Sequence, residues 1–442
     1  MLFRRSSDPG ESGTADAGDA TDALVDGDRA LRRGTAQAAL RHRDFRLVWG
    51  GTFLSNIGTW MQNVLLGKFA LDLTGDAGYV GLLYFAQLGP LLFLSQIGGV
   101  IADRVDRRRY LVVMQMTQML LSFGLAALVI VEHPSKWGIF GCVLAIGIVN
   151  ALSAPSMGAI LPTLVPKEDI PGAVSLQSVQ MNLSRVLGPV LGAPLLAIFG
   201  AEWVFAINAG TYAFAVAGLM LARYDARNPN PIQGRISEKL LSGIRIAWHD
   251  RLLRRIFVTM FTFSFFSLMY VGLFPEVADT NFGISASDTY LLLYAVWGIG
   301  ATLGALTIGT YLAEHSKARI VRYSLAAFSV LLAVFALIRS APLAFIVSPA
   351  LGFVYFLVIT ALSTIMQEHL EDHVRGRIMA IWIMSFGGTV PIGVYVGGLM
   401  ISALGMTISE VMFVGVAAAL VLAWYCDLEA VGAGATDPTT TS

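Results

Sequence analysis

Apolar runs long enough to cross a lipid bilayer follow one another along almost the whole of this chain. A membrane-spanning helix needs about 20 consecutive apolar residues, and inside hydrocarbon such a segment must satisfy its own backbone hydrogen bonds. Hydrophobic residues make up 55% of the 442 residues and charged residues only 14%. The pattern predicts an all-α polytopic membrane protein with twelve spans, at residues 45–73, 77–103, 109–132, 137–164, 170–199, 202–223, 254–281, 286–313, 319–339, 343–367, 375–404 and 407–426.

The basic residues indicate which side of the membrane each loop occupies. Short loops rich in Lys and Arg stay in the cytoplasm. With the N-terminus inside, the 30 Lys and Arg lie in cytoplasmic segments or at cytoplasmic helix ends, except for two that fall outside and two that fall within spans: Lys136, Arg339, Lys68 and Arg185. We therefore expect a multi-pass protein of the cell membrane with both termini in the cytoplasm.

Hydrophilic stretches divide the chain into two bundles and two tails. Residues 1–40 and 427–442 lack an apolar period and are expected to be cytoplasmic tails, the first of them disordered. A regulatory segment is the alternative for the first tail. Residues 224–252 form a cytoplasmic linker between six helices in 41–223 and six in 253–426. The linker ends in an amphipathic basic stretch, which is expected to lie along the membrane surface.

The two halves of the chain echo each other. A short charged loop followed by a glycine enters the fifth span at 164–176 and the eleventh at 369–381. Both of these spans contain an internal proline, Pro189 and Pro391. Duplicated bundles that meet at a midplane cavity are typical of secondary transporters. We therefore expect two pseudo-symmetric six-helix bundles.

The loop between the second and third spans carries a specific motif. Its spacing Gly-x-x-x-Asp-Arg-x-x-Arg-Arg is formed by Gly99, Asp103, Arg104, Arg107 and Arg108. This run resembles motif A of the major facilitator superfamily. Asp106 stands where the general pattern has glycine, as in the branch that contains drug:proton antiporters and the enterobactin exporter. The runs 55–64, 85–90, 184–192 and 374–382 resemble that branch too, and the resemblance covers about residues 44–426.

The resemblance implies a cytoplasmic latch between the two bundles. Asp103, at the end of the second helix, would face the positive N-terminal end of the eleventh helix near Arg375. Arg107 and Arg108 would pair with Glu168 or Asp169 in a neighbouring loop. The alternative is that these arginines only set the topology and contact lipid phosphates.

The fifth span partly matches motif C of the antiporters. Gly188, Pro189 and Gly192 are present, and Ser184 replaces the glycine expected upstream. Small residues at these positions permit close helix approach, and a proline removes a backbone donor and kinks the span. Simple packing is the alternative explanation.

Arg185 lies near the middle of its span, where a charge costs about 2.5–3.5 kcal/mol even on lenient insertion scales. It continues a polar stripe formed by Ser175, Ser178 and Asn182, whose spacing keeps one helix face. We expect this face to line the central cavity, where Arg185 would attract an anionic substrate group or modulate a proton site. The alternative is an interhelical anchor to carbonyl groups or Asn150.

Other polar and aromatic residues are candidates for the same cavity. The first span carries a stripe of hydrogen-bonding residues, of which we assign Asn56, Thr59, Gln62 and Asn63 to the cavity. Gln87 on the second span and Tyr294 on the eighth complete the expected lining. Interhelical hydrogen bonding and aromatic packing are the alternatives. Lys68 lies on the opposite face, four residues before Asp72, and is expected to snorkel outward and pair with it.

The coupling site is expected among the few acidic residues in the spans. Glu276, beside the helix-breaking Pro275, is our candidate for proton binding. No phosphate-binding loop occurs, so the chain has no ATPase motif, and we expect neither an enzyme nor a cofactor. His369 and His373 do not have the arrangement of a zinc pair, and no metal site is expected. Cys142 and Cys426 are expected to be small buried hydrophobic residues.

These patterns and the resemblance predict a secondary transporter that exports small amphiphilic compounds, drugs or metabolites, in exchange for protons by alternating access. A dedicated siderophore exporter is an alternative within the same fold. A ligand sensor that does not transport is the alternative from another class. The expected partners are a small-molecule substrate, protons and the lipid bilayer, with no nucleic acid, and the resemblance implies a monomer.

Overall fold

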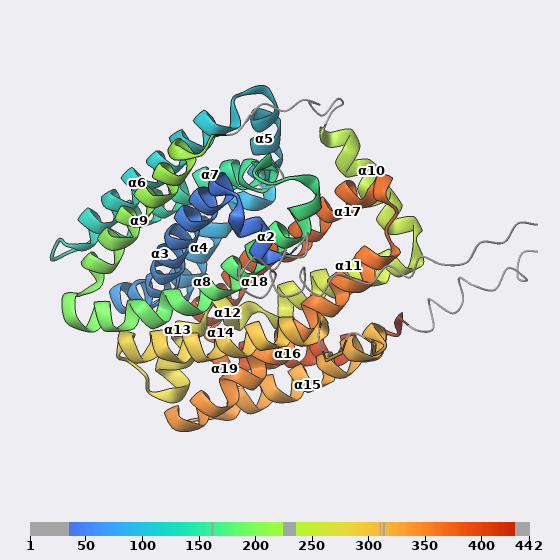
Figure 1. Cartoon of the computed structure of the whole chain (residues 1–442). Coiled ribbons are helices and arrows are strands. Elements are labelled where there is room, and N and C mark those ends of the chain that lie inside the picture. The colour runs from blue at the N-terminus through green and yellow to red at the C-terminus, as the bar shows by residue number, and fades with distance from the viewer. Residues whose placement is uncertain (1–34, 161–162, 224–235, 310, 313, 429–442) are drawn as a thin grey trace, which may run out of the picture.

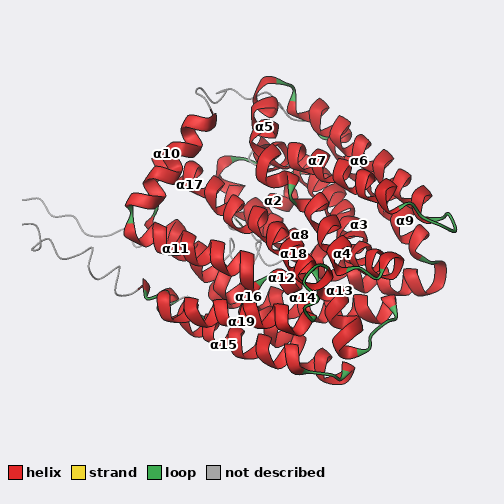
Figure 2. Ribbon diagram, turned by 180° about the vertical axis from the view of Figure 1, so that it is seen from behind, coloured by secondary structure: helices red, strands yellow, loops and turns green. Residues whose placement is uncertain are grey.

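The computed structural model describes residues 35–160, 163–223, 236–309, 311–312 and 314–428. Throughout this part of the chain the regular secondary structure is helical (Figure 2). The expected tails lie largely outside the described residues. Helical structure begins inside the stretch expected as the first tail, because Ala36–Arg41 form a short helix that packs on the fifth span.

The N-terminal bundle follows the expected spans closely. Its elements are α2 (Ala36–Arg41), α3 (Arg43–Thr74), α4 (Ala77–Leu88), α5 (Pro90–Arg104), α6 (Arg107–Val129), α7 (Lys136–Ile160), η2 (Lys167–Asp169), α8 (Ile170–Phe199) and α9 (Ala201–Leu221). The second span is divided into α4 and α5 at Gly89, because Pro90 lacks the backbone N–H that would continue the helix.

The helices of the C-terminal bundle are interrupted more often than those of the N-terminal bundle. It comprises α10 (Ile236–His249), α11 (Arg251–Thr262), η3 (Phe263–Ser267), α12 (Met269–Gly272), α13 (Phe274–Glu276), η4 (Val277–Asn281), α14 (Ser287–Gly309), α15 (Lys317–Leu337), α16 (Ala341–His369), α17 (Asp372–Ile383), η5 (Met384–Gly388), α18 (Thr389–Ser402) and α19 (Ile408–Tyr425). Of these, η3, η4 and η5 are π-helical turns, which interrupt the seventh and eleventh spans as such turns do at functional sites.

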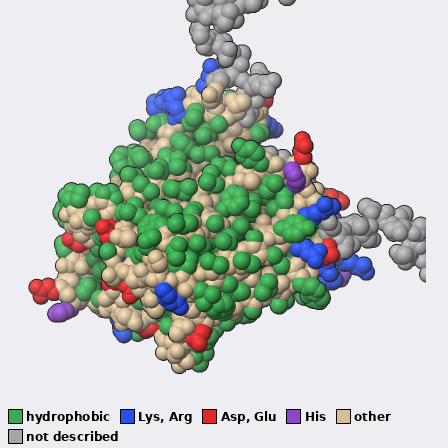
Figure 3. Space-filling view, turned by 90° about the horizontal axis from the view of Figure 1, so that it is seen from below, with side chains coloured by type: hydrophobic (Ala, Val, Ile, Leu, Met, Phe, Trp, Pro, Cys, Tyr) green, Lys and Arg blue, Asp and Glu red, His purple; other side chains and the backbone are tan. Residues whose placement is uncertain are grey.

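Ten helical segments of the described chain are long and apolar enough to cross a membrane. The two remaining expected spans are also present as helical rods. One is α3, which carries the polar stripe, and the other is the broken rod from Arg251 to Asn281. A broad surface of hydrophobic side chains covers the face drawn in Figure 3, with charged side chains mainly toward its margins. Such a surface fits contact with lipid.

The two bundles lie side by side, with α8, α14 and α18 between them (Figure 1). They are in contact through the halves that the sequence predicts to face the outside of the cell, which we call their outer halves. Near the outer ends of α4 and α18, Gly398 lies so close to the carbonyl oxygen of Ala77 that a Cβ would be only 2.5 Å from it. Only glycine permits this approach. Farther in, a Cβ on Gly298 of α14 would lie 3.5 Å from Val186 of α8.

Each bundle has a His–Asp pair at the end that the sequence predicts to face the cytoplasm. His42, between α2 and α3, bonds Asp169 with 2.8 Å between Nε2 and Oδ2. His369, at the end of α16, makes the same contact at 2.8 Å with Asp250, which precedes α11. In both halves the pair ties the first long helix to the loop before the fifth. The similar position of the two pairs agrees with the similarity between the two halves of the sequence.

The interiors of the two bundles differ. In the C-terminal bundle, neighbouring aromatic rings connect α13, α14, α15 and α16. Phe274, which is 0% exposed, contacts five rings with centroid separations from 5.5 to 6.3 Å: Tyr270, Tyr290, Tyr294, Trp297 and Phe335. Trp297 continues the cluster to Tyr355 at 5.4 Å. This interior is closely packed and largely apolar.

Candidate functional site

A cavity of about 440 Å³ lies inside the N-terminal bundle, between α3, α4, α6, α7, α8 and α9. Its wall is unusually rich in amide side chains, and the described lining residues include no Lys, Arg, Asp, Glu or His. Nine of them are amides: Asn56, Gln62, Asn63, Gln87, Gln115, Gln118, Asn150, Gln177 and Gln180. An amide both donates and accepts hydrogen bonds, so this wall is suited to an uncharged polar group.

Five of the residues assigned to the cavity from the sequence lie in this wall. They are Asn56, Thr59, Gln62, Asn63 and Gln87. The lining residues on α6, α7, α8 and α9 were not predicted from the sequence. Pairs of glutamines three residues apart could have indicated two of them: Gln115 and Gln118 on α6, and Gln177 and Gln180 on α8.

Hydrogen bonds between neighbouring helices hold the wall in place. Gln62 accepts from Nδ2 of the buried Asn208 at 2.7 Å. Thr59 shares a hydrogen bond of 3.2 Å with the hydroxyl of Tyr212. Gln87 donates to Asn63, which joins α4 to α3. Gln62 and Asn63 on α3 are therefore held by α9 and α4 respectively.

The serine stripe of α8 lies on another face of that helix. Ser178 is exposed and its hydroxyl donates to its own helix at Val174, 3.2 Å away. Asn182 likewise donates to the carbonyl of Ser178 at 2.9 Å. Neither residue lines the cavity, and neither does Arg185 or Tyr294. Tyr294 is 8% exposed and belongs to the aromatic interior of the C-terminal bundle.

Arg185 lies between the two bundles. Its guanidinium carbon is 4.7 Å from the ring centre of Trp60 on α3 and 4.9 Å from that of Phe356 on α16. Within the described residues, no carboxylate lies within ion-pair distance of it, and its buried Nε has no hydrogen-bond partner. The expected alternative, an anchor to carbonyl groups or Asn150, is absent from this part of the chain. Aromatic faces from both bundles hold the cation instead.

The motif C residues lie at a close contact between α8 and α3. A Cβ on Gly188 would be 2.7 Å from the backbone nitrogen of Met61, so only glycine fits. Gly192 lies against the side chain of Met61, and Pro189 is buried beside Gly188. These residues thus pack the two helices that carry Arg185 and Trp60.

The motif A loop is described only in part. Gly99 is half-buried on α5, whereas the side chains of Asp103, Arg104 and Arg375, and Gly376 with them, lie outside the described residues. The proposed latch therefore stays a prediction. Arg107 is buried at the start of α6, with 9% exposure.

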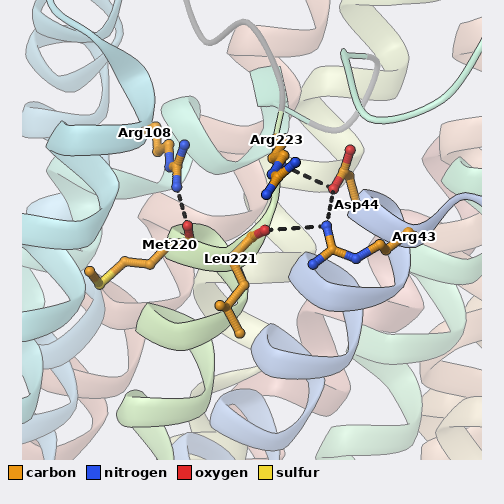
Figure 4. A network of polar contacts seen from close by, with 6 residues as sticks. All are labelled: Arg43, Asp44, Arg108, Met220, Leu221 and Arg223. Atoms are coloured by element: carbon orange, nitrogen blue, oxygen red, sulfur yellow. Dashed lines mark hydrogen bonds and ion pairs between the residues drawn. The ribbon is translucent and has the colours of Figure 1, made fainter.

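Arg108 contacts the end of α9 instead of the acidic residues of the loop before α8. Its guanidinium donates to the carbonyl of Met220, as Figure 4 shows. Nearby, Arg43 reaches the carbonyl of Leu221 at 3.5 Å, and Asp44 accepts from the backbone N–H of Arg223 at 3.0 Å. Carbonyl groups at a helix C-terminus lack intrahelical partners and favour cations. This explains why Arg108 binds there.

A cluster of charges connects the bundles at the end of α3 that the sequence predicts to face the outside of the cell, and we call it the outer cluster. Lys68 on α3 pairs with Asp72 and lies 3.6 Å from Oδ1 of Asp279 on η4. Asp72 also accepts from Ser287 of the C-terminal half at 3.3 Å. The expected pairing with Asp72 is present, but the expected route to solvent is wrong. Lys68 is only 1% exposed, because the seventh span covers it.

Glu276 lies beside this outer cluster. It is half-buried, accepts a hydrogen bond from Thr280 at 2.9 Å, and is within electrostatic range of Lys68 and Asp279. The residue expected to bind a proton thus shares its surroundings with an ion-paired lysine. A change in its charge would act on the contact between α3 and η4.

Comparisons with known proteins show that this chain is similar to membrane transporters. The sequence model of the family described as transmembrane secretion effectors matches residues 34–441. The chain is 25% identical to the staphyloferrin A transporter of Staphylococcus aureus over 358 residues, which is 78% of this chain and 86% of that protein. It is 26% identical to the enterobactin exporter EntS of Shigella boydii over 344 residues, 77% of this chain and 81% of the exporter.

Solved structures agree on the fold. The chain resembles a mutant form of the nucleoside transporter NupG with a TM-score of 0.72 and 14% identity, covering 88% of this chain and all of that one. It resembles the transporter PepTSo of the POT family with the same TM-score and identity, covering 90% and 99% of the two chains. The all-α polytopic fold expected from the sequence is thereby confirmed.

Proposed function

The chain belongs to the family of transmembrane secretion effectors, within the major facilitator superfamily, and we propose that it exports a siderophore or a compound of similar chemistry in exchange for protons. The names of its relatives support the substrate class. Membrane transport follows from the family. The substrate, the direction and the coupling ion are the proposed part.

The position of Arg185 is the observation that carries the proposal. A cation near the middle of a membrane helix is costly unless it is compensated, and two aromatic rings compensate this one only in part. An anionic group on the substrate would supply the missing charge. Because Trp60 and Phe356 come from different bundles, a ligand bound to Arg185 would be sensed by both halves, as a ligand that shifts a conformational equilibrium requires.

Proton coupling is assigned to the outer cluster. Glu276 is the proposed carrier, because its charge acts on Lys68 at the contact that closes the outer side. A change in the protonation of Glu276 would alter the electrostatic energy of that contact. Opening toward the outside would then depend on the pH there.

Efflux of uncharged amphiphilic drugs is a second candidate. The aromatic rings of Trp60 and Phe356 favour it, since they offer apolar ring faces where the two bundles meet. The two candidates differ in their need for Arg185. A drug without negative charge gains little from the cation, whereas an anionic siderophore should depend on it.

Transport by purified protein in proteoliposomes tests the proposal. Staphyloferrin A, enterobactin and an uncharged dye are supplied under an imposed pH gradient, and substrate-dependent proton movement is recorded. We expect flux of at least one siderophore, reduced about 10- to 100-fold in Arg185→Ala, as for loss of a hydrogen bond to a charged group. Arg185→Lys, which keeps the charge, serves as the matched control and should retain part of the flux.

Other outcomes favour the alternatives. Dye flux that Arg185→Ala leaves intact, without siderophore flux, would identify a drug exporter. Binding without flux in either direction would identify a sensor.

A further inference from the structure

The amide-lined cavity contains two buried acceptors that no described protein group satisfies. Oε1 of Gln180 on α8 and Oε1 of Gln115 on α6 lack a hydrogen-bond partner among the described residues. Gln180 is 0% exposed and still belongs to the cavity wall. Buried polar groups in proteins are normally paired, so two unpaired oxygens in the wall of one cavity call for a donor from elsewhere.

The orientation of Gln180 follows from its neighbour. The hydroxyl of Thr52 donates to the carbonyl of Val48 at 2.8 Å. Its oxygen must therefore accept from Gln180, whose Nε2 is 3.1 Å away. This contact fixes which end of the amide meets Thr52. The carbonyl oxygen of Gln180 is consequently the free end, and it can only accept.

The charge of the wall restricts what the donor can be. The described lining residues include no carboxylate to balance an ammonium group and no cation to balance an anion. A charged group placed there would remain uncompensated. A hydroxyl or an amide N–H supplies a donor without charge. Arg185 lies one helical turn beyond the lining residue Met181 on α8, so it offers a place for an anion close to the cavity but outside its wall.

We infer that the cavity is a subsite for uncharged hydrogen-bond donors of the substrate, with Gln180 and Gln115 as acceptors and Arg185 as the separate partner of its anionic group. The inference rests on the proposed function, since it assigns two groups of the same substrate to two places: the uncharged donors to the cavity and the anionic group to Arg185. The protein should therefore select compounds that carry both a carboxylate and free hydroxyl or N–H groups.

Binding of two small probes to the full-length protein in nanodiscs tests the subsite. The probes are 2,3-dihydroxybenzoate and 2,3-dimethoxybenzoate, which share the ring and the carboxylate, whereas methylation removes both donors. Calorimetry gives the ratio of their dissociation constants. We expect the dihydroxy compound to bind about tenfold more tightly, the value of one well-formed hydrogen bond, and we expect Gln180→Leu to bring the ratio close to one.

Two further variants complete the design. Gln115→Leu tests the second acceptor and keeps the inference testable should Gln180→Leu not fold. Gln367→Leu makes the same change on an exposed part of α16, outside the cavity, and should preserve the wild-type ratio.

The outcomes separate this inference from the proposed function. Equal binding of the two probes to the wild type, or a tenfold ratio that survives both cavity variants, would overturn the subsite while binding that depends on Arg185 still stood. If neither probe bound and Arg185→Ala changed the binding of no anion, the proposed function would fail together with the subsite.

Discussion

The two bundles share a helix order but have opposite interiors. The N-terminal bundle encloses a cavity with nine amide side chains, whereas the interior of the C-terminal bundle contains packed aromatic rings. The two halves therefore differ in the chemistry between their helices. The interior of the N-terminal half carries hydrogen-bonding groups, and that of the C-terminal half is closely packed and largely apolar.

Removing a ring from the C-terminal interior should have the largest effect on stability. Phe274→Ala deletes a fully buried side chain that contacts five aromatic neighbours. We expect it to cost about 3–5 kcal/mol and to lower the unfolding temperature of the purified protein strongly. Phe214→Ala, at an exposed position of α9, is the control. Equal shifts in the two variants would mean that the aromatic interior is not the stabilising half.

A change in the N-terminal interior should cost less stability. Gln62→Leu removes the acceptor of Asn208, whose amide is 0% exposed. An unpaired buried donor costs about 1–3 kcal/mol, so the fall in unfolding temperature should be smaller than for Phe274→Ala. The contrast between the bundles would be lost if Gln62→Leu proved the more harmful of the two.

The outer cluster is where the two halves depend on each other. Lys68→Met leaves Asp72 and Asp279 facing each other without the cation between them. We expect an outward-open population raised about tenfold, corresponding to about 1.4 kcal/mol. Spin labels at Glu132→Cys and Leu404→Cys, in a background without Cys142 and Cys426, would report this as a longer distance between the outer ends. Lys68→Arg should leave the distance distribution unchanged.

The smallest effect concerns a feature common to both halves, the His–Asp pairs. Burial raises the pKa of Asp250, but the hydrogen bonds from His369 and the backbone of Leu253 outweigh this and hold the pKa below its ordinary value of 3.8. The pair therefore contributes stability above pH 3.8, which is lost as the pH falls through the lower pKa of the folded state. Because the pair is largely exposed, we expect less than about 1 kcal/mol.

Unfolding temperatures of the wild type and His369→Asn, compared between pH 3 and pH 6, check this expectation. The difference between the two proteins should shrink toward the acid end. A difference that grows as the pH falls would contradict the assigned role of the pair.

The sequence predicts the helices and one wall of the cavity because both depend on periodicity within a single helix. The stripe on α3 can be recognised without knowing its neighbours. Lys68 shows the limit of this reasoning, since its burial depends on Asp279, more than two hundred residues away in the chain. The aromatic partners of Arg185 likewise come from α3 and α16. The burial of Lys68 and the aromatic contacts of Arg185 both depend on tertiary contacts between the bundles, which the pattern within one helix does not reveal.

The uncompensated charge of Arg185 also has an electrical consequence. A carrier that binds an anion at this residue is nearly neutral there when loaded and positive when empty. A membrane potential exerts about 2.3 kcal/mol per elementary charge for each 100 mV across the full bilayer, and a residue near the middle of α8 experiences part of that field. The voltage would then act mainly on the return of the empty carrier. In such a transporter the membrane potential would drive the return of the empty carrier, and it would contribute little to the step that translocates the bound substrate.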